Sequence, residues 1–96
     1  MKVISAGHQY ELLNKNGTRI VGTLNFVKKV NGSMMHDGTT TEEVIDVLVD
    51  RLRTLDEKFP CKENTNAITA LLQAKQELEA RTKDRTERGV EGKDKS

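Results

Sequence analysis

The residue pattern best suited to chemistry lies near the end of the chain, where Arg81, Arg85 and Arg88 follow one another at helical spacing. In a helix, Arg81 and Arg85 would lie one turn apart on the same face. Their planar guanidinium groups could bind phosphate oxygens bidentately, each contact contributing roughly 1.5–3 kcal/mol. The alternative interpretation is structural, because Lys and Arg favour helix C-termini and pair with acidic residues four positions away.

Two further side chains could contact a small ligand. Asn64 could hydrogen-bond to a base or ribose edge, although a short polar side chain is also typical of a helix cap. Tyr10 could stack on a purine, although a tyrosine in a sheet belongs more often to the edge of the core. Both alternatives stay open on the residues alone.

Patterns that would indicate catalysis are weak. Cys61 has no histidine close to it in sequence and fits the role of a small apolar group. His8 and His36 lack the spacing of a zinc pair, and His36 with Asp37 alone is a poor metal site. The glycines stand at turns and form no phosphate-binding loop. We therefore expect a binding protein with no catalytic residue, no metal and no cofactor.

Charge balance limits the partners. The chain has 16 Lys and Arg against 15 Asp and Glu, a net charge of +1, whereas a protein that coats a nucleic acid polymer usually needs a strongly basic domain. A small anion needs only a few well-placed cations. No apolar stretch approaches the roughly 20 residues that cross a bilayer, and the N-terminus lacks the apolar run of a signal peptide. We expect neither a nucleic acid polymer nor a membrane as partner, and a cytoplasmic location.

Two helices are expected to position the candidate residues. Thr40 and Glu43 match a capping box that begins a helix over residues 40–59, which Pro60 ends, and a second helix follows over residues 63–88. The short connection predicts an antiparallel hairpin. Helical spacing predicts the inward-facing residues. In the first helix these are Val44, Leu48, Leu52, Leu55 and Phe59, widened by Ile45 and Val49. In the second, the apolar side consists of Ile68, Leu71, Leu72 and Leu78, and the stripe of Leu71, Ala74 and Leu78 continues as the three arginines.

The pattern of residues 1–32 is strand-like. Asn16 and Gly17 predict the turn of a hairpin from about residue 8 to residue 23, because this pair tolerates positive φ angles. Another strand is expected over residues 23–30 and a loop over residues 33–38. The fold class is therefore α+β, with a small N-terminal antiparallel β-sheet followed by the two-helix hairpin. We expect one domain over residues 1–96, with a polar tail at 89–96, and a core thin enough to favour self-association.

Four segments together resemble a known family. They are ISAGHQYEL, DGTTTEEVIDVLVDRL, EKFPCKEN and RTKDRTERGVEG. They are similar to the Thoeris anti-defence sponges of phages, a family that shares its C-terminal helical hairpin with the anti-CBASS cyclic-dinucleotide sponges. The resemblance covers nearly the whole chain.

The resemblance implies a function and a site. Family members hold a cyclic ADP-ribose isomer intact, without cleavage, in a pocket between protomers that assemble through their helices, up to a hexamer. Some also bind cyclic di- or trinucleotides at separate sites. Carried over residue by residue, the ligand-binding positions are Asn64, Arg81 and Arg85. Arg88 and Tyr10 are further candidates from the residue pattern alone. Thr54 stands where the family often has an aromatic residue, which could alter the ligand preference.

Three classes of function follow from these observations. The preferred one is a sponge that sequesters the cyclic ADP-ribose isomer in the host bacterial cytoplasm and so blocks the Thoeris effector. A sponge for CBASS cyclic oligonucleotides alone, or a small regulator that binds nucleic acid or protein, is the alternative. A nucleotide-cleaving enzyme is disfavoured because the arginines lack accompanying catalytic groups.

Overall fold

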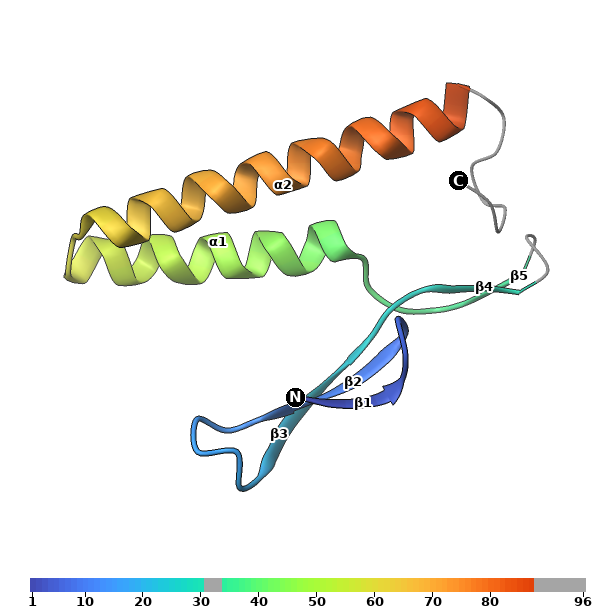
Figure 1. Ribbon diagram of the computed structural model, residues 1–96, viewed down its shortest axis with the longest axis horizontal. Helices are drawn as coiled ribbons and strands as arrows, with labels where there is room; N and C mark the ends of the chain where they lie inside the picture. The colour runs from blue at the N-terminus through green and yellow to red at the C-terminus, as the bar shows by residue number, and fades with distance from the viewer. Residues whose placement is uncertain (31–33, 88–96) are drawn as a thin grey trace. The chain divides into compact units, whose positions relative to one another are not determined.

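The computed structural model describes residues 1–30 and 34–87, which fall into two compact units divided in sequence between Thr40 and Thr41 (Figure 1). Side chains are described for residues 1–28 and 37–84. The first unit contains antiparallel strands and the second contains two helices, which confirms the expected α+β class. The tail expected over residues 89–96 lies outside the described residues.

The first unit begins with a three-stranded antiparallel sheet in the order β1-β2-β3. Tyr10 lies opposite both Val3 and Leu24, at the centre of the sheet. Residues directly opposite each other on neighbouring strands point to the same face of a sheet, so these three side chains share one face. The strands are β1 (Lys2–Ser5), β2 (Gln9–Leu13) and β3 (Ile20–Asn25).

The turn between β2 and β3 is longer than the Asn16 and Gly17 pair predicts. Gly17 has the expected positive φ of 72°, and its N–H donates to the Asn14 carbonyl oxygen at 2.9 Å. The side-chain Oδ1 of Asn14 accepts from the N–H groups of Thr18, at 2.8 Å, and Arg19, at 3.2 Å. Asn14 thus supplies from its side chain the hydrogen bonds that a two-residue turn would make through its backbone.

The strand expected over residues 23–30 is interrupted, and the loop expected over residues 33–38 is partly wrong. β3 ends at Asn25, and a separate strand β4 (Lys28–Val30) pairs antiparallel with β5 (Met34–His36). A strand as short as β5 shows too few alternating side chains for periodicity to reveal it.

The interruption has a structural cause. Residues 37–39 approach the chain between β3 and β4: the Thr39 N–H donates to the Asn25 carbonyl at 2.7 Å, and the Val27 N–H donates to the Thr39 carbonyl at 3.0 Å. A Cβ on Gly38 would stand 2.6 Å from the Asn25 carbonyl oxygen, so only glycine fits without a shift of the backbone. We call this contact between residues 25–27 and 37–39 the crossing.

The second unit is a helical hairpin of α1 (Thr41–Lys58) and α2 (Lys62–Glu87), which run antiparallel side by side (Figure 1). The end of α1 before Pro60 confirms the expected stop, because the residue before a proline avoids helical geometry. In the connection, Asp56 Oδ1 accepts from the Cys61 N–H at 3.1 Å. Neither helix is long and apolar enough to cross a membrane.

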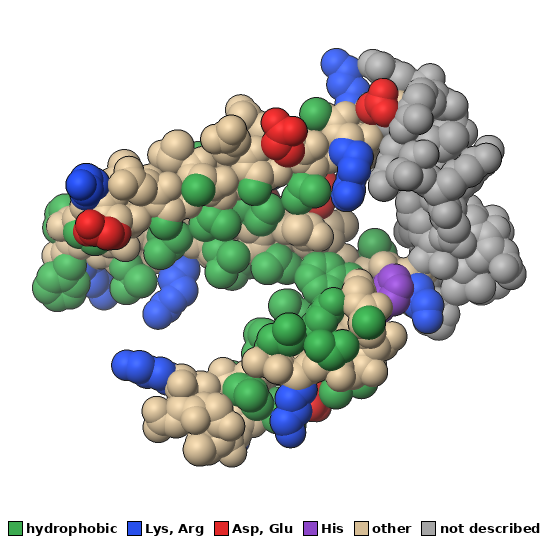
Figure 2. Space-filling view, viewed as in Figure 1, with side chains coloured by type: hydrophobic (Ala, Val, Ile, Leu, Met, Phe, Trp, Pro, Cys, Tyr) green, Lys and Arg blue, Asp and Glu red, His purple; other side chains and the backbone are tan. Residues whose placement is uncertain are grey.

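The packing of α1 is centred on Ile45 and Val49, which the helical spacing placed only at the margin of the inward face. Ile45 and Val49, with 6% and 4% of their surface exposed, are the buried residues of the described side chains. Leu48, Leu55 and Phe59, which the helical spacing placed inward, are exposed, Phe59 to 77%. The inward face therefore follows Ile45 and Val49, and an apolar strip remains on the outside of α1, where hydrophobic side chains gather along the hairpin in Figure 2. This outer strip consists of Val47, Leu48, Leu55 and Phe59.

Candidate functional site

The two helices differ in length, and the difference exposes the end that carries the arginines. α2 has 26 residues against 18 in α1. Lys75 Nζ lies 2.7 Å from Asp46 Oδ1, which fixes the register between the helices. Counting from this pair, the position of Arg81 falls beyond Thr41, the first residue of α1. The last turns of α2 therefore have no α1 residue beside them, and we call them the overhang.

The Lys75–Asp46 pair is the ion pair recorded between the helices among the described side chains. The hydrogen bond that Lys75 donates to Asp46 raises the pKa of Lys75 above its usual 10.5. Burial opposes this rise, and the negative charges of Asp46, Glu79 and Glu43 add to it. Both side chains are partly exposed, Lys75 to 27% and Asp46 to 48%, so water screens the attraction. The pair therefore defines the register more than it stabilises the hairpin.

Arg81 lies on the exposed side of α2. The expectation that Ala74 and Arg81 continue an inward stripe is wrong, because both are exposed while Lys75 and Thr82 are half-buried. The half-buried residues are one position further along the helix, which rotates the inward face away from Arg81. An exposed guanidinium in the overhang is accessible to a ligand.

The other two arginines are only partly covered by the structure. The backbone of Arg85 belongs to α2, one turn after Arg81, so the helical spacing assumed for the pair is present. The side chain of Arg85 and the whole of Arg88 lie outside the described residues.

Asn64 and Thr54 lie at the opposite end of the hairpin, near the connection between the helices. Asn64 is half-buried in the first turn of α2, which begins at Lys62, so Asn64 does not occupy the capping position before the helix. Thr54 is exposed, and its Oγ1 donates to the Asp50 carbonyl at 3.0 Å. Thr54 also lines a shallow hollow on the outside of α1 together with Val47 and Leu55.

One chain does not bring these candidates together. Since each helical residue advances about 1.5 Å, Asn64 and Arg81 are about 26 Å apart along α2. That distance exceeds what two side chains can span to contact one small ligand. Within one chain, the structure therefore separates the amide from the guanidinium.

Tyr10 is engaged in the first unit. Its hydroxyl oxygen accepts from the Gly7 N–H at 2.7 Å, and its ring meets that of Phe26 edge-to-face, with centroids 6.0 Å apart. The half-buried ring thus packs within its own unit, as the alternative of a core-edge tyrosine describes.

Comparison with known proteins gives one informative match. No family model matches the chain. The chain is 40% identical over 57 residues to Thoeris anti-defense 1 of Bacillus phage SBSphiJ7. This match confirms the predicted resemblance to the Thoeris anti-defence family. The aligned region covers 58% of this chain and 40% of that relative, so the chain spans less than half of the length of the relative it matches.

The remaining polar residues give no metal site in the described part of the chain. No group of three or more His, Cys, Asp and Glu side chains lies close enough together there to hold a metal ion. Cys61 is exposed at the connection between the helices, which differs from the small buried group that its sequence context suggests.

Sequence reasoning missed one feature of the first unit. A pocket of about 320 Å³ lies where the ends of β1, β2 and β3 meet the start of β4. Its polar residues come from positions far apart in sequence and form no motif, so only the fold reveals them. The lining residues are Ser5, His8, Gln9, Asn25, Phe26, Lys28 and Asp37.

Proposed function

We propose that this chain is a phage anti-defence protein that binds a cyclic ADP-ribose isomer in the host bacterial cytoplasm and sequesters it intact. Removing the signal would keep the Thoeris effector inactive. The observation that carries the proposal is the 40% identity to Thoeris anti-defense 1. The exposed Arg81 in the overhang supports it independently, because guanidinium groups are suited to bidentate contact with phosphate.

Binding without cleavage is the chemistry that suits these side chains. Guanidinium and amide groups hold phosphate oxygens and ribose or base edges, but they do not attack a phosphoanhydride bond. A sponge acts by mass action, so its dissociation constant must lie well below that of the effector it competes with. Each tenfold gain in affinity requires about 1.4 kcal/mol.

The separation of Asn64 from Arg81 leads us to propose that two chains build each site. If a second hairpin packs antiparallel to the first, the overhang of one chain lies beside the connection of the other. Arg81 of one chain and Asn64 of its partner would then reach the same ligand. A two-fold arrangement repeats the pairing, so each dimer would have two such sites.

The outer strip of α1 supports association through the helices. Val47 is 61% exposed and Phe59 is 77% exposed, and a strip of apolar side chains on one helix face is stabilised when a partner removes it from water. The proposed assembly is a homodimer, which could in turn build a hexamer. Replacing Val47 with Asp should dissociate it, as sedimentation would show, while Arg53→Asp, also on α1, should leave it intact.

The first experiment is capture followed by release. The protein is incubated with a cyclic ADP-ribose isomer, separated from unbound ligand and denatured by heat, and the released molecule is identified by mass spectrometry. Recovery of the unchanged isomer supports a sponge. Recovery of a hydrolysed product would show an enzyme instead.

Calorimetric titration tests the arginine. Arg81→Ala should weaken binding of the isomer about ten- to a hundredfold, the range expected for one charge-assisted contact, without unfolding the protein. Lys83→Ala is the matched control, because Lys83 lies two residues further on the opposite face of α2. The same loss is expected for Arg85→Ala. Unchanged affinity in Arg81→Ala would refute the site.

Mixing two inactive variants tests whether the site spans two chains. Asn64→Ala and Arg81→Ala should each lose binding, but each mixed dimer should regain one intact site. Random reassociation of equal amounts would then restore about a quarter of the sites. No recovery after dissociation and reassociation would argue for a site within one chain.

Titration with other ligands addresses the alternatives. Thr54 stands where the family often has an aromatic residue, and α1 has no aromatic side chain that could stack on a base. A sponge for CBASS cyclic di- or trinucleotides is therefore the second candidate. Such a sponge would bind those ligands and not the cyclic ADP-ribose isomer. A regulator that binds nucleic acid polymer would instead show affinity that falls steeply with salt and no saturation by a small ligand.

A further inference from the structure

We propose that the pocket in the first unit binds a small oxoanion, a phosphate or carboxylate group, independently of the signal site on the helices. Its lining includes three side chains suited to hold an anion: Ser5 at the end of β1, His8 just before β2, and Lys28 at the start of β4. They belong to the same compact unit, so the pocket requires no second chain.

Backbone hydrogen bonds hold the pocket walls in place. The His8 N–H donates to the Ser5 carbonyl at 2.9 Å and closes a tight turn, in which Gly7 adopts a φ of 80°. The His8 carbonyl in turn accepts from the Phe26 N–H at 2.7 Å. The turn is thereby connected to the end of β3, next to the crossing, so the backbone that carries Ser5 and His8 is positioned before any ligand arrives.

His8 supplies the observation that points to a ligand. Its Nδ1 atom is buried and has no hydrogen-bond partner among the described residues. A buried polar atom without a partner is rare in folded proteins, because it loses its hydrogen bond to water and gains nothing in return. Because Nδ1 is shut off from solvent, an anion in the pocket would reach it only if the ring turned toward the pocket. The anion would then accept a hydrogen bond from the Nδ1–H group and remove this cost.

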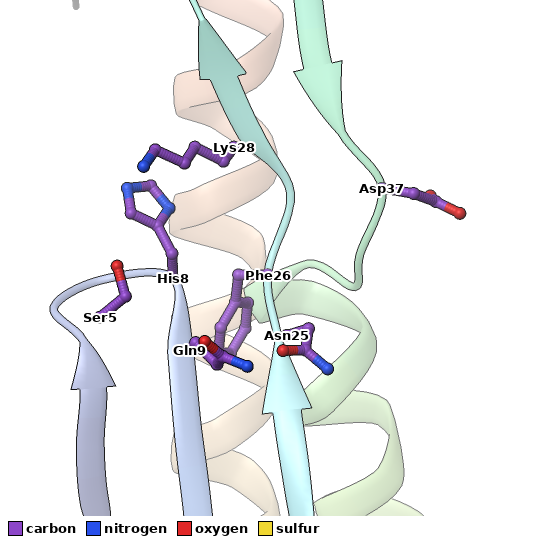
Figure 3. Close-up of a pocket in the computed structure, with 7 residues that line it drawn as sticks. All are labelled: Ser5, His8, Gln9, Asn25, Phe26, Lys28 and Asp37. Atoms are coloured by element: carbon purple, nitrogen blue, oxygen red, sulfur yellow. The ribbon is translucent and has the colours of Figure 1, made fainter.

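The charges around His8 favour an anion. Figure 3 shows the Lys28 side chain extended across to the His8 ring, with the Ser5 hydroxyl directed to the same region. The acidic side chain of the lining, Asp37, points away, and its Oδ1 accepts from the Gly38 N–H at 2.9 Å. The pocket therefore presents the cationic group of Lys28 and the hydrogen-bonding groups of Ser5 and His8 where a ligand would lie.

Size and lining set the kind of molecule that fits. A volume of about 320 Å³ is near the lower limit of small-molecule pockets, which span about 300–1,000 Å³. The Phe26 ring and the amides of Gln9 and Asn25 complete the lining and would contact a compact organic group attached to the anion. A phosphomonoester and a carboxylic acid share this chemistry, so both are tested.

The experiment follows backbone amide signals of the full chain by NMR during titration with inorganic phosphate and, separately, with acetate. Sodium chloride holds the ionic strength constant. We expect saturable shifts at Ser5, His8 and Phe26 with at least one of the two anions. In Lys28→Met the affinity should fall at least tenfold. Lys15→Met, at an exposed lysine in the turn between β2 and β3 of the same unit, should behave like the unaltered protein.

Two outcomes would overturn the proposal. Shifts of equal size in Lys28→Met and Lys15→Met would mean that anions screen surface charge without occupying a site. The absence of saturable shifts with both anions would mean that the pocket takes no oxoanion. This test is independent of the signal site on the helices. The Arg81→Ala variant should show the same shifts with the anions, whether or not that variant still binds the cyclic ADP-ribose isomer.

Discussion

The two units of this protein are stabilised by different interactions. In the helical hairpin, side chains fill the space between two regular elements, and Ile45 and Val49 are buried between α1 and α2. In the first unit, no described side chain is buried to that extent, and the strands are connected by backbone hydrogen bonds at the crossing and in the turns. The hairpin should therefore be sensitive to side-chain volume, and the sheet unit to backbone geometry.

The sharpest test of this difference is Gly38→Ala. The added methyl group would stand 2.6 Å from the Asn25 carbonyl oxygen, so the crossing must open or the backbone must shift. We expect a loss of about 3 kcal/mol in the free energy of unfolding, the upper end for overpacking, measured by urea denaturation. Gly22→Ala is the control, because a Cβ there meets no atom within 4 Å. Equal effects of the two variants would contradict the assigned role of the crossing.

The corresponding test in the hairpin is Ile45→Ala. Removing this buried side chain should lower the free energy of unfolding by about 2 kcal/mol, the low end for large-to-small substitutions because the core is thin. Leu48→Ala, on the exposed side of the same helix, is the comparison. If the outer strip mediates association, the effect of Leu48→Ala should depend on protein concentration and that of Ile45→Ala should not.

A smaller effect is expected from Asn14→Ala in the first unit. The variant removes the oxygen that accepts from the N–H groups of Thr18 and Arg19, which an exposed turn can partly replace with water. We expect a loss of about 1 kcal/mol by urea denaturation. Asn16→Ala, in the same turn, should change the stability by less than about 0.5 kcal/mol.

The smallest effect should come from the ion pair between the helices. Because the pKa of Lys75 is raised in the folded chain, its pairing with Asp46 stabilises the protein below pH 10.5 and is lost as the pH rises through the raised value. Lys75→Met should therefore be slightly less stable than the unaltered protein at pH 7, and the difference should shrink above pH 10.5. Urea midpoints at both pH values would show it. A difference that grows with pH would contradict this assignment.

The helical half of the fold could be predicted from the sequence because its signals are local. A polar start at Thr40, apolar residues at helical spacing and Pro60 suffice to indicate α1. The sequence predicts less clearly which face of α1 is inward. Apolar residues cover more than one face of this helix, and the packing of α2 determines which of them are buried. The sheet half was harder, because the crossing depends on residues 25–27 and 37–39 meeting in space.

The candidate site shows the same limit. The types of Arg81 and Asn64 indicate ligand contacts, but residue type alone does not reveal that one helix holds them about 26 Å apart. The sequence does not indicate the pocket around His8. Ser5, His8 and Lys28 are common polar residues, and only their proximity in the fold suggests a binding site. Local chemistry is thus readable from the sequence, while long-range placement requires the fold.

The overhang of α2 also has a thermodynamic consequence. With no α1 residue beside them, its turns gain less from packing than the rest of the hairpin, and a short helical end of this kind is only marginally stable. A ligand held by Arg81 would therefore also stabilise the helix that presents it, and the two equilibria would be linked. A substitution that lowers helical propensity in this segment would then weaken capture without ever touching the ligand.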